Sequence, residues 1–129
     1  MNLKDFTDKK LAFALIKGDK ILYKSKKQRL APLIFCLKKY KSQMRGATVF
    51  DKVVGRAVAL LLIYGRIKEV KTALISEGAI KLFGKNKIKL SYGKKVKHIL
   101  NRTGDDLCPM EKLSRDKTFK EFCKILKVK

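Results

Sequence analysis

One segment of the 129-residue chain limits its possible folds more than any other, because it is apolar on almost every side. The helix predicted over Lys52–Tyr64 has its charges only at its start, on Asp51, Lys52 and Arg56, and is followed by Gly65. Its remaining residues are apolar around the whole circumference: Val53, Val54, Ala57, Val58, Ala59, Leu60, Leu61, Leu62 and Ile63. A helix without a polar face is normally buried. The sequence therefore predicts a fold whose other elements enclose this helix.

Strand and helix patterns alternate around the apolar helix. Short strands are predicted at 47–50, 69–75 and 88–92, and a second helix at 76–83 ends before Gly84. Strands that alternate with helices indicate crossover connections, which join parallel strands. The middle of the chain is thus expected to form a parallel sheet.

The N-terminal part of the chain has the pattern of a hairpin followed by a helix. Two strand-like runs, 11–17 and 20–24, flank Gly18-Asp19, a dipeptide typical of a two-residue turn. Apolar residues then recur at helical spacing over 30–40. Because a hairpin pairs antiparallel, its addition to the parallel strands would make the sheet mixed.

These elements predict an α/β fold for a single domain spanning residues 1–129. The expected architecture is a mixed sheet of about five strands with helices on both faces. A loop at 101–107 and a closing amphipathic helix at 118–126 are predicted beyond the last strand.

Composition limits the functional class. With 46% hydrophobic residues the chain can build a core, which excludes wholesale disorder. The 33 Lys and Arg exceed the 11 Asp and Glu by 22 charges, with a net of +10 in 1–45, +2 in 46–80 and +10 in 81–129. The nearly neutral middle is predicted to be the buried centre, and the basic flanks favour anionic partners.

Membrane and secretory functions do not fit this sequence. The longest apolar run, 57–64, is far shorter than the ~20 residues of a membrane span. The first five residues include an early acid and no long apolar segment typical of a signal peptide. Cys36, Cys108 and Cys123 form no CxxC pair and no even-numbered set, which favours a reducing, cytoplasmic location.

The candidate site follows from the predicted sheet, because open α/β sheets bind ligands beyond the carboxyl ends of their parallel strands. Both such ends are also predicted helix N-termini, where free N–H groups and the helix dipole favour anions. We expect a nucleotide or another anionic small molecule to bind there, through Asp51, Lys52, Arg56, Ser76, Glu77 and Gly78. The alternative is that Asp51 and Ser76 only cap their helices and that the cations are solvated beside them.

Cys108 is the candidate catalytic residue. It precedes Pro109, a residue suited to the first turn of a helix, and an N-cap thiol there would favour its thiolate form. The alternative is a buried cysteine that closes a tight loop. His98, predicted to be a partly exposed helix residue, is the single imidazole of the chain, and the cysteines lack zinc spacing, so no metal or cofactor is expected.

Three motifs in order resemble a small prokaryotic family of unknown function with a cytidine deaminase-like fold: Asp51-Lys52-Val53-Val54-Gly55-Arg56, Ile75-Ser76-Glu77 and Cys108-Pro109-Met110-Glu111. The resemblance implies a three-layer α/β/α sheet. Zinc deaminases carry H-x-E and P-C-x-x-C at two helix starts. Here the corresponding starts hold Asp51-Lys52-Val53 and Ser76-Glu77-Gly78, which contain no zinc ligand set, so the resemblance implies a deaminase scaffold that is not a zinc-dependent deaminase.

The sequence is compatible with three functions. The leading one is binding of an anionic small molecule at the former active-site position, with turnover left undecided. The alternatives are a basic RNA- or DNA-binding module and a regulatory or interaction protein with a vestigial pocket. Tyr23, Tyr40, Tyr64 and Tyr92 are too scattered in sequence to predict a base-stacking platform, so nucleic-acid binding is expected to be weak.

Overall fold

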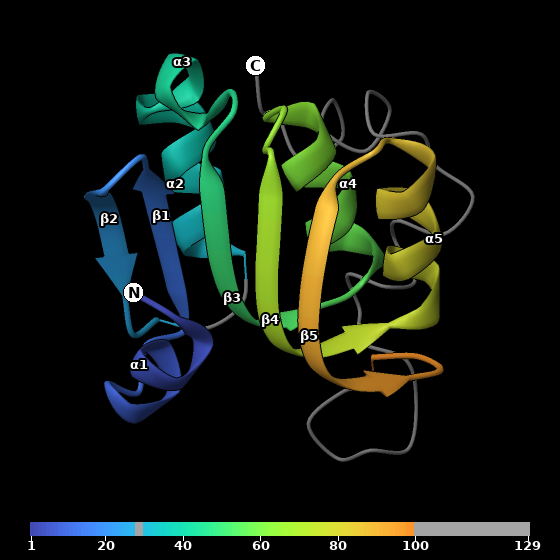
Figure 1. Cartoon of the computed structure of the whole chain (residues 1–129). Helices are drawn as coiled ribbons and strands as arrows, with labels where there is room; N and C mark the ends of the chain where they lie inside the picture. Colours follow the sequence, from blue (N-terminus) through green and yellow to red (C-terminus); the bar gives the residue numbers. More distant parts are fainter. Residues whose placement is uncertain (28–29, 100–129) are drawn as a thin grey trace.

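The computed structural model describes residues 1–27 and 30–99, which form one five-stranded sheet in the order β2-β1-β3-β4-β5 (Figure 1). The strands are β1 Phe13–Lys17, β2 Lys20–Ser25, β3 Thr48–Val54, β4 Glu69–Ser76 and β5 Lys89–Val96. β1 pairs antiparallel with β2 and β3, whereas β3–β4 and β4–β5 are parallel. The predicted mixed α/β sheet with its N-terminal hairpin is confirmed.

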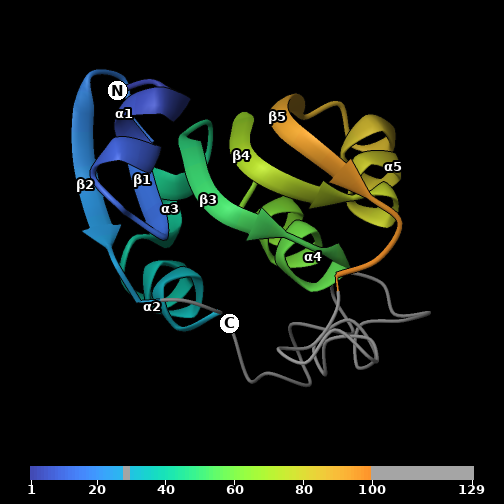
Figure 2. The ribbon, with the colours of Figure 1, turned by 90° about the horizontal axis from the view of Figure 1, so that it is seen from below.

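Helices cover the two faces of the sheet unequally (Figure 2). They are α1 Leu3–Asp8, α2 Ala31–Lys39, α3 Lys41–Met44, α4 Arg56–Tyr64 and α5 Glu77–Lys85. α2, α4 and α5 share one hydrophobic core on one face, and α1 packs against β3 and β4 on the other. No helix formed by the described residues has the length and hydropathy needed to cross a membrane.

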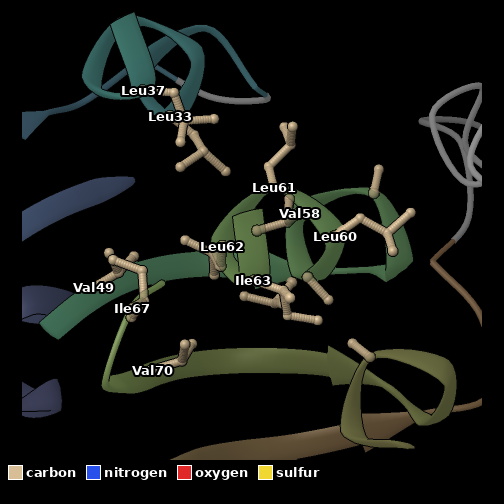
Figure 3. Packing of buried hydrophobic residues seen from close by; sticks show 14 of the residues in the cluster. Leu33, Leu37, Val49, Val58, Leu60, Leu61, Leu62, Ile63, Ile67 and Val70 are labelled. Carbon is tan, nitrogen blue, oxygen red and sulfur yellow. The ribbon is translucent and has the colours of Figure 1, made fainter. Parts of the chain in front are cut away.

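The apolar helix lies at the centre of the larger core, as predicted. All seven residues 57–63 of α4 are buried. In Figure 3, Leu61 faces Leu33 and Leu37 of α2, while Leu62 and Ile63 lie toward the sheet. α4 tolerates apolar side chains all round because α2, α5 and the sheet each cover one of its sides.

The second face has a smaller core beneath α1. Phe6 of α1 packs on Phe50 of β3, with ring centroids 5.5 Å apart. The Asn2 side chain accepts a hydrogen bond of 2.8 Å from the backbone N–H of Asp5 and so starts the helix. α1, capped by Asn2, thus holds one large aromatic side chain against the sheet.

Several predicted boundaries are wrong, and the largest error lies between β3 and α4. The strand expected to end at Phe50 continues to Val54, and the helix begins at Arg56 instead of Lys52. Val53 and Val54 pair with Leu74 and Ile75 of β4. The β-branched side chains of Val53 and Val54 favour a strand. Their pairing with β4 therefore extends β3 past Asp51, the residue that was predicted to cap the helix.

The C-terminal half of the described chain needs smaller corrections. β5 continues past Tyr92 to Val96, and α5 continues one residue beyond Gly84. His98 is exposed in a bend instead of a helix. The predicted loop at 101–107, the helix at 118–126 and Cys108 lie outside the described residues.

Candidate functional site

The carboxyl ends of β3 and β4 bring two helix N-termini together. Val54 pairs with Ile75, so the next residues, Gly55 and Ser76, are neighbours at this edge of the sheet. Gly55 is the N-cap of α4 and Ser76 is the N-cap of α5. The two helices start at the same edge and pack side by side (Figure 1). Their positive dipole ends therefore point to a common region.

The two N-termini differ in how they are capped. Ser76 is buried, and its Oγ accepts a hydrogen bond of 3.2 Å from the backbone N–H of Ala79, while Glu77 places an acid in the first turn of α5. Gly55 has no side chain to offer, and the first turn of α4 contains no acid. An external anion would complement the dipole of α4 more than that of α5.

The cation nearest to the start of α4 in sequence is Arg56, its first residue. Arg56 is half-buried, Glu77 is exposed and Gly78 is half-buried. Of the predicted site residues, the structure places Arg56, Ser76, Glu77 and Gly78 at the start of one or the other helix. Their role in binding remains a prediction.

Asp51 does not cap a helix, contrary to the sequence prediction. It lies within β3, pairs with Phe13 on one side and Thr72 on the other, and is 7% exposed. Desolvation by burial raises the pKa of Asp51 well above its ordinary value, although hydrogen bonds from the backbone N–H groups of Val53 and Lys52 oppose that shift. Asp51 is therefore a buried acid of the strand, not a residue at the helix start.

Lys52 is also displaced from its predicted position. As the next residue of β3 it projects from the face opposite to Asp51, and it is exposed. The lysine and the aspartate do not meet on one side of the sheet. The prediction that they jointly form a helix N-terminus is wrong.

The residues described by the structure contain no group of three His, Cys, Asp or Glu side chains that could hold a metal ion. The resemblance compared Asp51-Lys52-Val53 and Ser76-Glu77-Gly78 with the zinc motifs. The first of these lies in β3, and the helix starts in the structure are Gly55-Arg56-Ala57 and Ser76-Glu77-Gly78. None of these six residues except Glu77 has a side chain that binds zinc. The side chains that the described residues place at these two helix starts thus do not fit a zinc centre.

Sequence reasoning missed a pocket at the opposite edge of the sheet. It has a volume of about 310 Å³ and is lined by Lys41, Ser42, Arg45, Tyr64, Gly65 and Arg66. Sequence reasoning also missed an aromatic cluster of Tyr23, Phe35 and Tyr40. The ring centroids of Tyr23 and Tyr40 are 6.5 Å apart, and both rings lie near that of Phe35. The expectation that the tyrosines are scattered fails for this pair. The sequence did not predict this cluster because its rings come from segments that are distant in sequence, Tyr23 from β2 and Phe35 from α2.

Comparison with known proteins places the chain in a family. The model of a domain of unknown function, DUF1893, matches residues 2–128. The chain belongs to the DUF1893 family. It is similar to the crystal structure of a DUF1893 family protein from Thermotoga maritima, with a TM-score of 0.87 and 30% sequence identity over 96% of this chain and 84% of that one. No protein with a curated description matches.

The family membership bears out part of the resemblance. The chain is in a family of unknown function, and its relative has the same mixed α/β fold. Neither comparison names a ligand, a reaction or a partner. Because a fold does not define a function, the function of this chain depends on the geometry of its own site.

Proposed function

We propose that this DUF1893 protein binds a phosphate-bearing small molecule, a nucleotide in the first place, at the edge where β3 and β4 end. The observation that carries the proposal is the N-terminus of α4, which adjoins that of α5 and has neither a side-chain cap nor an acid in its first turn. Uncapped N–H groups at a helix start form a common phosphate site. Arg56 adds a guanidinium there, a group suited to phosphate.

The neighbouring helix would supply the second wall of the site. Ser76 uses its hydroxyl to cap α5, so its contribution is to fix the backbone of Glu77 and Gly78. The exposed carboxylate of Glu77 would repel phosphate but accept hydrogen bonds from ribose or base donors. A nucleotide would satisfy both helix starts, with phosphate at α4 and hydroxyl or amino groups at α5.

The scaffold proposed for this activity is deaminase-like and binds without zinc. Its support is the mixed sheet with helices on both faces, which is the layered arrangement implied by the resemblance. The proposal assigns binding and no reaction. Asp51 and Lys52 are left out of the contact set, since one is buried in the strand and the other projects from the opposite face.

The test compares ligand-induced stabilisation of three variants in buffers of equal ionic strength. Gly55→Asp introduces a carboxylate cap at α4, which occupies the N–H groups and repels phosphate. Arg56→Gln removes the guanidinium, and Lys81→Gln removes an exposed cation from α5 as the matched control. A nucleotide present at 100 times its Kd would stabilise the wild type by about 2.7 kcal/mol.

The proposal predicts that inorganic phosphate and nucleotides stabilise Lys81→Gln as much as the wild type. Gly55→Asp and Arg56→Gln are expected to lose most of this ligand-induced stabilisation. If Gly55→Asp does not fold, the result for Arg56→Gln alone tests the proposed site. A full response in Arg56→Gln and in any folded Gly55→Asp protein, or no response in the wild type, would refute the proposed site.

A further inference from the structure

The edge opposite to the proposed nucleotide site concentrates positive charge. β1 ends there and the other four strands begin there, so four connecting segments meet (Figure 1). These segments carry eleven Lys or Arg and two Asp or Glu, a local net charge of +9. We name this surface the basic edge and define it as residues 17–20, 38–46, 65–69 and 84–89.

The pocket of about 310 Å³ lies on the basic edge, between α3 and the end of α4. Lys41 Nζ donates a hydrogen bond of 2.9 Å to the Tyr64 hydroxyl and lies 4.6 Å from the centre of its ring. Arg45 and Arg66 line the same pocket and are exposed. Three cations around one concave site provide the donors that a phosphodiester needs.

The pocket has a closely packed base. A Cβ at Gly65 would come within 3.0 Å of Met44 Cε and 3.2 Å of Leu37 Cδ2, so α2, α3 and the end of α4 approach closely there. The backbone N–H of Gly46 also bonds to the carbonyl of Arg66 at 2.9 Å. The backbones that carry Lys41, Arg45 and Arg66 are thus joined by packing and by a direct hydrogen bond.

The aromatic cluster is linked to the pocket through the chain, because Tyr40 belongs to the cluster and the next residue, Lys41, lines the pocket. Phe35 of α2 lies 5.0 Å from the ring of Tyr23 and 6.3 Å from that of Tyr40, and it is 41% exposed. Lys39 Nζ lies 5.6 Å from the ring centres of both Phe35 and Tyr40. Tyr40 directly precedes Lys41, so the aromatic cluster and the pocket are continuous along the chain.

We propose that the basic edge binds single-stranded nucleic acid, with a base stacked on Phe35 and a backbone phosphate in the pocket of Lys41, Arg45 and Arg66. Proteins that bind single strands combine a cationic groove with exposed aromatic rings in this way. An acidic peptide would use the charges but not the exposed ring. A duplex keeps its base faces stacked internally and offers Phe35 no partner.

The first test measures binding of fluorescent oligo(dT) and oligo(U) by anisotropy over a range of salt concentrations. The triple variant Lys41→Gln/Arg45→Gln/Arg66→Gln is compared with Lys9→Gln/Lys26→Gln/Lys97→Gln, which removes the same charge from exposed residues elsewhere. Three lost phosphate contacts reduce the slope of log K against log salt by about 2 in a single-strand binder. The control variant is expected to retain the wild-type slope.

The second test separates base stacking from charge. Phe35→Leu keeps an apolar side chain but removes the ring, and it should weaken binding by about 5- to 150-fold, the range expected for one stacked base. Tyr92→Leu removes an aromatic ring that is 45% exposed on β5 and serves as the matched control. Melting temperatures of all variants without ligand verify that they are folded.

The proposal requires that the wild type bind the single strands more tightly than a duplex or inorganic polyphosphate. It is overturned if the wild type does not bind at low salt. It is equally overturned if duplex and polyphosphate bind as tightly as the single strands, if the two triple variants lose equal affinity, or if Phe35→Leu binds like the wild type.

Discussion

The buried carboxyl group of Asp51 makes a prediction about stability that depends on pH. Its side chain is 7% exposed in the middle of β3, beside the fully buried Thr72. Burial raises the pKa of Asp51 in the folded state, so the folded protein binds this proton more tightly than the unfolded chain does. The stabilisation linked to this proton is complete below the ordinary carboxyl pKa of about 3.9 and is lost as pH rises through the raised, folded-state pKa.

The substitution Asp51→Asn keeps the size of the side chain and removes the titration. Between the unfolded and folded pKa values, the wild type should lose about 1.4 kcal/mol of unfolding free energy per pH unit relative to Asp51→Asn. Above the folded pKa, the difference between the two proteins should become constant. The free energy of unfolding of Asp51→Asn is thus expected to rise relative to that of the wild type as pH increases.

Urea unfolding at intervals between pH 3.5 and 8 measures this difference directly. Asp8→Asn removes an exposed acid at the end of α1 and shows what the loss of one negative charge does to this cationic chain. If the free-energy difference between wild type and Asp51→Asn does not change with pH, folding does not shift the pKa of Asp51 and the reasoning from burial is refuted.

Two further predictions concern the core. Leu61→Ala, which truncates a fully buried side chain of α4, should lower the free energy of unfolding by about 2–5 kcal/mol in urea titrations; a loss below 1 kcal/mol would contradict the enclosure of α4. Burial raises the pKa of the Cys36 thiol to about 12, so alkylation at pH 8 followed by peptide mapping should leave Cys36 unmodified until urea unfolds the protein, and rapid labelling of the native state would argue against its burial.

The fold was largely predictable because its strongest signals are periodic and local. The all-apolar segment 57–63 had to be enclosed, and the Gly18-Asp19 turn indicated an antiparallel hairpin. Ser76 also caps α5 as its residue type suggested. Each of these features depends on residues close together in sequence.

The site was less predictable because it depends on pairing between distant segments. Asp51-Lys52 has the composition of a helix start, but the register of β3 on β4 extends the strand to Val54 and turns the two side chains to opposite faces. The aromatic cluster joins Tyr23 from β2 to Phe35 from α2, and the basic pocket joins α3 to the end of α4. No pattern within one segment indicates such contacts.

The central claim, that an anion binds at the start of α4, is tested most directly by amide chemical shifts. Titration of ¹⁵N-labelled protein with inorganic phosphate and then with a nucleotide should shift the backbone amides of Arg56, Ala57 and Val58, because these are the first-turn N–H groups that no side chain caps. The amides of Glu77 and Gly78 should follow when the nucleotide is added. Saturable shifts confined to other parts of the chain, or no saturable shifts with either ligand, would contradict the claim.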